Sequence, residues 1–231
     1  MRNFATLKEM VYKHIQKRII TGEFKPGERL REDEICKSLK TSRTPAREAF
    51  IKLEAEGFLI GLPHRGYIIK KLTLKEIKDI FITLGCLEGY AAKEATSKMA
   101  EKDIHLLKEN LSKMKQLLNQ RKYNLYNKYH LSFHNVFINA SENNVLIETI
   151  SLLKKRIYEH PKNLKVHTPE WFEKTIKEHE HMMSLFEKRD AEKIENYIRK
   201  VHWNVEESLP FIKKTFPFAN ADINYANLQN L

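Results

Sequence analysis

Residues 42–49 read Ser-Arg-Thr-Pro-Ala-Arg-Glu-Ala, and this stretch decides the fold of the N-terminal part of the chain. Ser42 is a residue type that caps helices, and Pro45 suits the first turn of a helix, where a missing N–H costs nothing. The apolar residues that follow recur with helical spacing, and Gly57 is typical of a helix end. The pattern predicts a helix from about Thr44 to Glu56.

Outward from this helix, the chain has the element order of a winged helix-turn-helix. Apolar residues at steps of four predict a helix over residues 6–22, and a shorter pattern predicts one over residues 32–39. After Gly57, two β-prone runs at 58–60 and 67–70 are joined by a segment with turn residues at both ends. Three helices followed by a hairpin predict a winged helix-turn-helix domain over residues 1–72.

The basic residues at the start of the third helix suit DNA. Arg43 and Arg47 are four residues apart, so they project on one side of a helix whose N-terminus could enter the major groove. Guanidinium groups make paired hydrogen bonds to guanine or phosphate, and hydroxyls beside a helix N-terminus suit phosphate oxygens. Two arginines alone are more often a solvated surface. The full predicted DNA-binding set is Arg31, Ser42, Arg43, Thr44, Arg47 and the wing residues His64, Arg65 and Gly66.

Charge and composition agree with a DNA-binding protein. The 231-residue chain has a formal net charge of +11, and residues 1–72 hold 16 Lys and Arg against 9 Asp and Glu. A surplus of positive charge favours a polyanionic partner. Cys36 and Cys86 have neither disulfide nor zinc spacing and are predicted to be small core residues. No apolar run is long enough for a membrane span, so we expect a cytoplasmic protein without a membrane partner.

The rest of the chain reads as an all-helical bundle, which makes the predicted fold class mainly α. Thr73 with Glu76 resembles a capping box, and helical periodicity continues to about residue 215. The predicted breaks lie at 139–144, 160–169 and 189–190, and the Asn-rich tail after Pro217 is expected to be loosely ordered or packed on a partner. Residues 73–231 are therefore predicted to form a second domain.

The first domain closely resembles the GntR family of bacterial transcription regulators. The family's recognition region reads Ser-Arg-Thr-Pro-x-Arg-Glu-Ala and is later followed by Glu-Gly; here these are residues 42–49 and Glu56-Gly57, with Gly66 as the wing glycine. The resemblance covers residues 6–72. It implies that Arg43, Thr44, Arg47, His64 and Gly66 stand at DNA-contact positions.

The second domain resembles the helical effector domain of the FadR branch of that family, called FCD. The cues are Leu87-Glu88-x-x-Ala91-Ala92, Phe133-His134 followed by Ala140-Ser141-x-Asn143, and Glu178-His179 eleven residues before Asp190. The resemblance spans residues 73–209 and implies an effector-binding and dimerisation domain.

Many such domains bind a divalent metal through an Asp, a His four residues later and two further His residues. Here His130 stands where the family has Asp, His134 follows it, and His179 matches the third position. Counting places the fourth ligand on Val201, so the neighbouring His202 joins only if its helix is shifted or rotated, because one residue turns a side chain by ~100°. The set His130, His134, His179 and His202 would be nitrogen-only, which favours zinc or nickel.

Two alternatives stay open for the bundle. A histidine among apolar residues can simply be a core imidazole bonded to a neighbour, so the cluster need not bind metal. Leu84 also stands where many relatives carry an Arg that meets a ligand carboxylate. Its presence favours a neutral or apolar effector, or metal alone, over a carboxylic acid held in the usual manner.

These features together predict a homodimeric transcription regulator that binds an operator in double-stranded DNA. We expect a repressor of metabolic genes controlled by a small molecule or metal in the bundle. The chain has no Gly-rich phosphate loop, nucleophile elbow or close carboxylate pair, so it is not expected to be an enzyme. The alternative is a metal-dependent enzyme that uses the histidine cluster.

Overall fold

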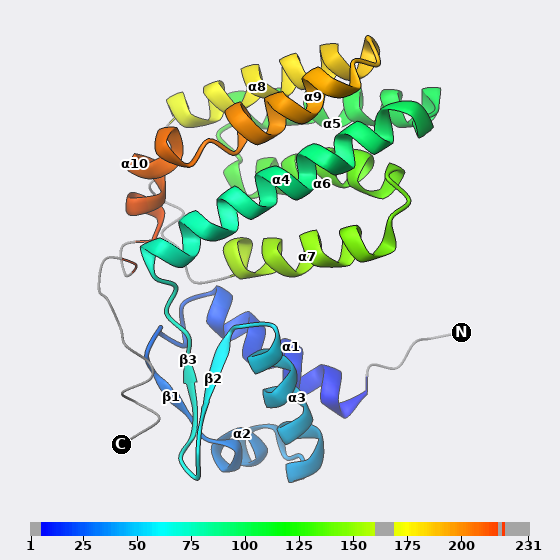
Figure 1. The fold of residues 1–231 in the computed structure, drawn as a ribbon. Coiled ribbons are helices and arrows are strands. Elements are labelled where there is room, and N and C mark those ends of the chain that lie inside the picture. The colour runs from blue at the N-terminus through cyan, green and yellow to red at the C-terminus, as the bar shows by residue number, and fades with distance from the viewer. Residues whose placement is uncertain (1–5, 160–168, 217–218, 220–231) are drawn as a thin grey trace. The chain divides into compact units, whose positions relative to one another are not determined.

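A computed structural model of the chain describes residues 6–159, 169–216 and 219, which fall into two compact units (Figure 1). The first unit holds the described residues up to Ile77, together with the end of one helix from Lys154 and of another from Ile212. The second unit holds Lys78–Leu153 and the described residues from 169 to Phe211. Helices dominate both units, so the predicted mainly α fold class is confirmed.

The first unit contains three helices and a small antiparallel sheet (Figure 1). The strand order is β1-β3-β2, and the β2–β3 hairpin pairs Ile60 with Ile68 and Leu62 with Gly66. The predicted helix-helix-helix-hairpin order is present, and a two-residue strand before the second helix was not predicted. The elements are α1 (Leu7–Ile20), β1 (Arg29–Leu30), α2 (Glu32–Leu39), α3 (Arg43–Ala55), β2 (Leu59–Leu62) and β3 (Gly66–Ile69).

One core holds the first unit together. Ile15 and Ile19 of α1 are fully buried against α3, which contributes Phe50 and Leu53. The Phe50 ring also lies 4.8 Å from the ring of Tyr67 on β3, so the helices and the hairpin share one core. The row of buried apolar residues on α1 is shorter than predicted because Leu7, in the first turn, is largely exposed.

The second unit is helical throughout its described residues (Figure 1). Within it α5 packs against α6 and α8, and α8 packs against α9. No helix in the part of the chain described here is long and apolar enough to cross a bilayer. Three of the elements, α4, α7 and α10, have one end in the first unit. The elements are α4 (Leu74–Lys98), α5 (Glu101–Asn119), α6 (Tyr123–Ala140), α7 (Asn144–Tyr158), α8 (Pro169–Glu187), α9 (Ala191–Tyr197), the π-helical turn η2 (Ile198–His202) and α10 (Val205–Thr215).

Several local features differ from the sequence-based predictions. The breaks at 139–144 and 189–190 are confirmed, but the chain also breaks at 120–122, where Arg121 takes a left-handed conformation without a glycine (φ 55°). Cys86 is exposed rather than buried. Most of the predicted 160–169 break and all but one residue of the predicted loose tail lie outside the described residues.

The predicted capping box at the start of α4 is present. The Glu76 backbone N–H donates to Thr73 Oγ1 (3.1 Å), and Glu76 Oε2 accepts from the Thr73 backbone N–H (2.9 Å). Lys70 Nζ lies 2.6 Å from Glu76 Oε1. Burial alone would raise the pKa of Glu76, but the hydrogen bonds from Lys70 and Thr73 outweigh it and hold the pKa below its ordinary value.

We predict that Glu76→Gln lowers the free energy of unfolding by about 0.5–1.5 kcal/mol at neutral pH, because it weakens these charge-assisted bonds. A carboxylate with a lowered pKa contributes stability that is present above its unfolded pKa and is lost as the pH falls through its folded pKa. The difference between wild type and variant should therefore persist at about pH 5 and shrink below about pH 4. Urea denaturation followed by circular dichroism measures it. Glu148→Gln, at an exposed carboxylate of α7, should change little at either pH.

Candidate functional site

A basic groove of about 700 Å³ opens on the first unit between α2, α3 and the β2–β3 wing. Six of the eight predicted DNA-binding residues line this groove; Ser42 and Thr44 do not, but they lie exposed at the start of α3. Only Glu32 and Asp33 bring negative charge to its lining. The residues of interest in the lining are Arg29, Arg31, Arg43, Arg47, His64, Arg65 and Gly66.

The start of α3 is built to face an anion. Ser42 occupies the N-cap position with extended backbone, but its side chain makes no capping hydrogen bond, and the first turn contains no acidic residue. Arg43 and Arg47 are exposed while Ala46 is buried, so the amphipathic pattern points the cations outward. Free N–H groups at a helix N-terminus attract phosphate oxygens. At the start of α2, Arg31 is partly engaged by Asp33, with Nε 3.3 Å from Oδ1.

The wing is held in place by a close backbone contact. Gly66 has φ +87°, and a β-carbon added there would lie 2.7 Å from the backbone oxygen of Leu30 on β1. Arg29 Nε donates to the backbone oxygen of Arg65 (2.6 Å), which ties the wing tip to β1 a second time. His64, at the tip, also has a left-handed backbone (φ 59°). The sequence identifies Gly66 as the wing glycine but does not identify Arg29. Arg29 lies on a strand of two residues, which is too short to show a periodic pattern.

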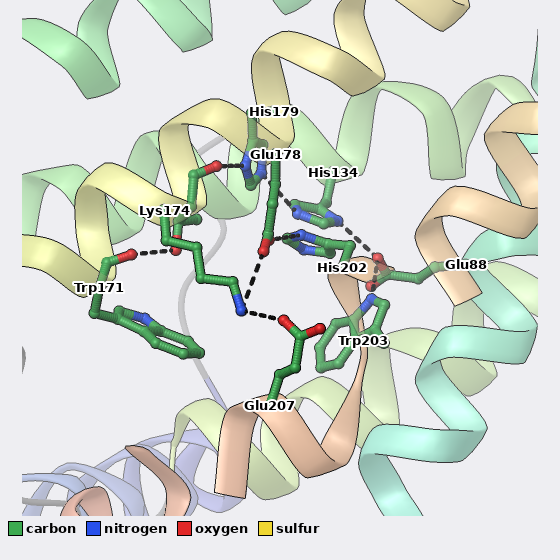
Figure 2. Close-up of polar contacts among 10 residues, drawn as sticks. Glu88, His134, Trp171, Lys174, Glu178, His179, His202, Trp203 and Glu207 are labelled. Carbon is green, nitrogen blue, oxygen red and sulfur yellow. Dashed lines mark hydrogen bonds and ion pairs between the residues drawn. The ribbon is translucent and has the colours of Figure 1, made fainter. Parts of the chain in front are cut away.

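The second unit brings four predicted histidines together. His130 and His134 come from α6, His179 from α8 and His202 from η2, and one ring nitrogen of each lies within 4.8 Å of the others. His134 and His179 are fully buried, and Figure 2 shows both beside His202. The His130 ring lies 4.8 Å from that of His134 and 4.9 Å from that of His179. The four side chains therefore form one compact histidine cluster.

Three of these rings have their Nδ1 atoms engaged away from the cluster (Figure 2). Glu88 Oε2 accepts from His134 Nδ1 (2.7 Å), and the Thr175 backbone oxygen accepts from His179 Nδ1 (2.6 Å). Glu178 Oε2 lies 2.9 Å from His202 Nδ1. A carboxylate or carbonyl can only accept, so each Nδ1 carries the proton and each Nε2 presents a lone pair when the ring is neutral.

Two ring nitrogens face each other at the centre of the cluster. His134 Nε2 and His179 Nε2 lie 3.1 Å apart, although both nitrogens are acceptors in the tautomers that their Nδ1 partners impose. Two lone pairs at this distance repel unless a proton or a metal ion lies between or beside them. Metal-binding histidines characteristically donate their other N–H to a carboxylate or carbonyl, as these three do. The residues present therefore fit a divalent transition metal.

A π turn explains how His202 reaches the cluster. The Trp203 backbone N–H donates to the Ile198 oxygen, five residues back (3.0 Å), whereas an α-helix would use the residue four back. Within this wider turn His202, its last residue, takes the inward position and Val201 stays exposed. From the sequence we expect His202 to join the cluster only if its helix is shifted or rotated, and the π turn provides this change. We recognised no signal in the sequence that predicts the π turn.

Glu178, which bonds His202, belongs to an ion-pair network that continues outward from the cluster. Lys174 Nζ lies 3.8 Å from Glu178 Oε1 and 2.5 Å from Glu207 Oε2, which links α8 to α10 (Figure 2). Leu84, which replaces the family's Arg, is fully buried in the core. His105 and His181 are exposed, whereas His160 and His167 lie outside the described residues.

A β-carbon at Gly66 cannot be accommodated without moving the wing. We predict that Gly66→Ala costs about 1–3 kcal/mol of stability in the first unit, since both the left-handed backbone and the contact with Leu30 oppose it. Gly22→Ala is the matched control, because Gly22 has a similar φ (+74°) but nothing within 4 Å of an added β-carbon. Thermal unfolding of both variants separates backbone strain from the close contact. Equal losses would show that the contact with Leu30 is unimportant.

Comparison with known proteins gives matches over nearly the whole described chain. The family model described as bacterial regulatory proteins, gntR family, matches residues 7–69, and that of the FCD domain matches residues 79–201. The HTH-type transcriptional repressor RspR of Escherichia coli (strain K12) is 23% identical over 215 residues, which covers 90% of this chain and 91% of the relative. The HTH-type transcriptional regulator YdhC of Bacillus subtilis (strain 168) is 29% identical over 154 residues, or 66% and 65% of the two chains. Among solved structures, E. coli McbR/YncC has a similar fold, with a TM-score of 0.69 and 19% identity over 90% of this chain and 98% of that chain.

Proposed function

Since this chain belongs to the GntR family of bacterial transcription regulators and carries an FCD domain, we propose that it is a repressor of metabolic genes whose operator affinity is set by a ligand in the helical bundle. The class of DNA-binding regulator is confirmed, and the alternative of a metal-dependent enzyme is not supported because the family and the relatives are regulators. A relative is named a repressor, which supports that direction of control. We assign DNA binding to residues 1–72 and effector binding and dimerisation to residues 73–231.

The observation that carries the DNA-binding assignment is the basic groove between α3 and the wing. Arg43 and Arg47 are exposed cations in the first two turns of α3 that line the groove, and they would read guanine edges or grip phosphates in the major groove. Ser42 and Thr44 would bind phosphate beside them, and Arg31 would do so from α2. His64 and Arg65, positioned by Gly66, would reach the adjacent minor groove or backbone. We expect the protein to act in the cytoplasm, where the chromosome lies.

A homodimer on a palindromic operator follows from how such domains read DNA. One recognition helix covers only a few base pairs, so helix-turn-helix proteins commonly pair to read two half-sites. We propose two chains per operator, joined through the FCD domain.

We predict that Arg43→Ala and Arg47→Ala each weaken binding to a selected operator by about 1–3 kcal/mol and relax its base preference. Arg65→Ala should weaken binding more evenly across sequences, since a wing arginine that contacts the backbone reads no base. The operator is first selected from random DNA with the wild-type protein, and affinities are then measured by fluorescence anisotropy at one salt concentration. The wild-type complex should contain two chains per duplex.

Lys17→Ala is the charge-matched control, because Lys17 on α1 does not line the groove. It should change operator affinity by less than either helix variant. If both helix variants bound the operator as tightly as wild type, the assignment of α3 as the recognition helix would be wrong.

For the bundle we propose a divalent transition metal, zinc or nickel, held by His130, His134, His179 and His202. Neutral imidazole nitrogens suit these ions and not magnesium. The support is the three fixed tautomers and the 3.1 Å approach of two Nε2 atoms. The metal would supply the positive charge that this approach requires, and the protein would contribute fixed ring orientations from α6, α8 and η2. Leu84 favours a neutral effector, or metal alone, over a gripped carboxylate.

Control of DNA binding would follow from a change in the population of two bundle states. A ligand shifts such an equilibrium only as far as it binds one state better than the other. The state in which the four imidazoles converge is the one that a metal would favour. We propose that effector binding at this site changes the affinity of the paired winged domains for the operator.

We predict that protein purified without a nickel column contains about one zinc or nickel ion per chain, and that His134→Ala loses most of it. Elemental analysis of both proteins measures this. His105→Ala is the matched control, since the His105 side chain is 72% exposed on α5, and it should keep the wild-type content. If wild type contains well under one metal ion per chain, and dialysis against zinc does not raise this content, the metal assignment is wrong. The pocket would then remain as a site for an organic ligand.

A further inference from the structure

Glu88 joins the histidine cluster to a tryptophan through a single oxygen atom. Its side chain is fully buried on α4, and Oε2 accepts hydrogen bonds from His134 Nδ1 (2.7 Å) and from Trp203 Nε1 (3.1 Å). Figure 2 shows the carboxylate between the two rings. The His134 Nδ1–H and the Trp203 indole N–H are both donors, so one buried carboxylate oxygen accepts from both.

Trp203 is the residue that closes the π turn. Its backbone N–H makes the five-residue hydrogen bond to Ile198, and it directly follows His202. Its side chain is anchored on α4 in two further places: a β-carbon added at Gly85 would lie 2.9 Å from Trp203 Cβ, and the ring meets Phe81 edge to face at 5.1 Å. Glu88 therefore orients His134 directly and holds the segment that carries His202.

We propose that Glu88 is the positioning residue of the cluster and that it couples metal occupancy to Trp203 and the π turn. This rests on the metal site proposed above. Coordination at His134 Nε2 draws electron density from the ring and makes Nδ1–H a stronger donor to the carboxylate. Because the same oxygen also accepts from Trp203, the Trp203 hydrogen bond changes when the metal binds. The coupling thus runs from α6 through α4 to the end of the π turn η2.

The two tryptophans of the chain make this coupling measurable. In the full-length, metal-free protein labelled with ¹⁵N, each indole N–H gives one resonance, and Trp171→Phe identifies which is which. Trp171 stacks on Phe211 at 4.0 Å and has no contact with Glu88 in Figure 2, so it serves as an internal control. Titration with zinc should shift the Trp203 signal until one ion is bound per chain, while the Trp171 signal stays in place. Equilibrium dialysis measures the zinc Kd independently.

Two glutamine variants separate positioning from packing. Glu88→Gln should raise the zinc Kd about 10–100-fold and abolish the zinc-dependent shift of Trp203. Glu178→Gln is the matched control: Glu178 bonds His202 and pairs with Lys174 but does not bond Trp203, so the variant should also bind zinc more weakly but keep the Trp203 shift at saturation. The titration of wild type does not depend on the glutamine variants, so it decides the coupling even if Glu88→Gln does not fold.

Two outcomes would overturn the inference while leaving the metal site standing. One is stoichiometric zinc binding by wild type without any shift of the Trp203 signal. The other is a folded Glu88→Gln protein with the wild-type zinc Kd. If dialysis finds no zinc bound to wild type, both this inference and the proposed metal site fail.

Discussion

The arrangement of the bundle depends on one constraint: three of the four clustered imidazoles give their Nδ1 proton to an acceptor. His134 uses a carboxylate from α4, His179 uses the backbone oxygen one turn earlier in its own helix, and His202 uses a carboxylate from α8. An unpaired buried N–H costs about 1–3 kcal/mol, so losing any acceptor would release a ring from its orientation. Helices far apart in the sequence are thereby required to meet at one place, and the same requirement leaves the Nε2 atoms facing one another.

The winged unit is held by a different kind of restraint. Its helices share an apolar core, but the wing depends on backbone contacts at β1, where Gly66 and Arg29 meet the chain before α2. The short third strand, β1, fixes the position of the wing tip at little cost in chain length. Glu32 and Asp33 are the only acidic residues among those that line the groove beside these basic side chains.

The features that could be predicted from the sequence are the ones with local signals. Ser42, Pro45 and Gly57 mark α3 by residue type, and its observed bounds, Arg43–Ala55, differ from the prediction by one residue at each end. The break at Arg121 was missed because a charged residue, not glycine, adopts the left-handed conformation there. Glu88 belongs to one of the motifs in the sequence, but its role could not be predicted because its partners, His134 and Trp203, lie 46 and 115 residues away. The strand β1 could not be predicted either, because it forms only by pairing with the distant strand β3.

The π turn affects how the spacing of the fourth histidine compares with the FCD domain model. The FCD match ends at Val201, one residue before the histidine that reaches the cluster. An extra residue within a helix would ordinarily throw every later side chain out of phase by about 100°. A π turn absorbs that residue inside the helix and returns the chain to its former phase without adding a loop. A one-residue insertion at this place would therefore leave a histidine directed at the cluster, so sequence spacing alone does not decide whether the set of four is complete.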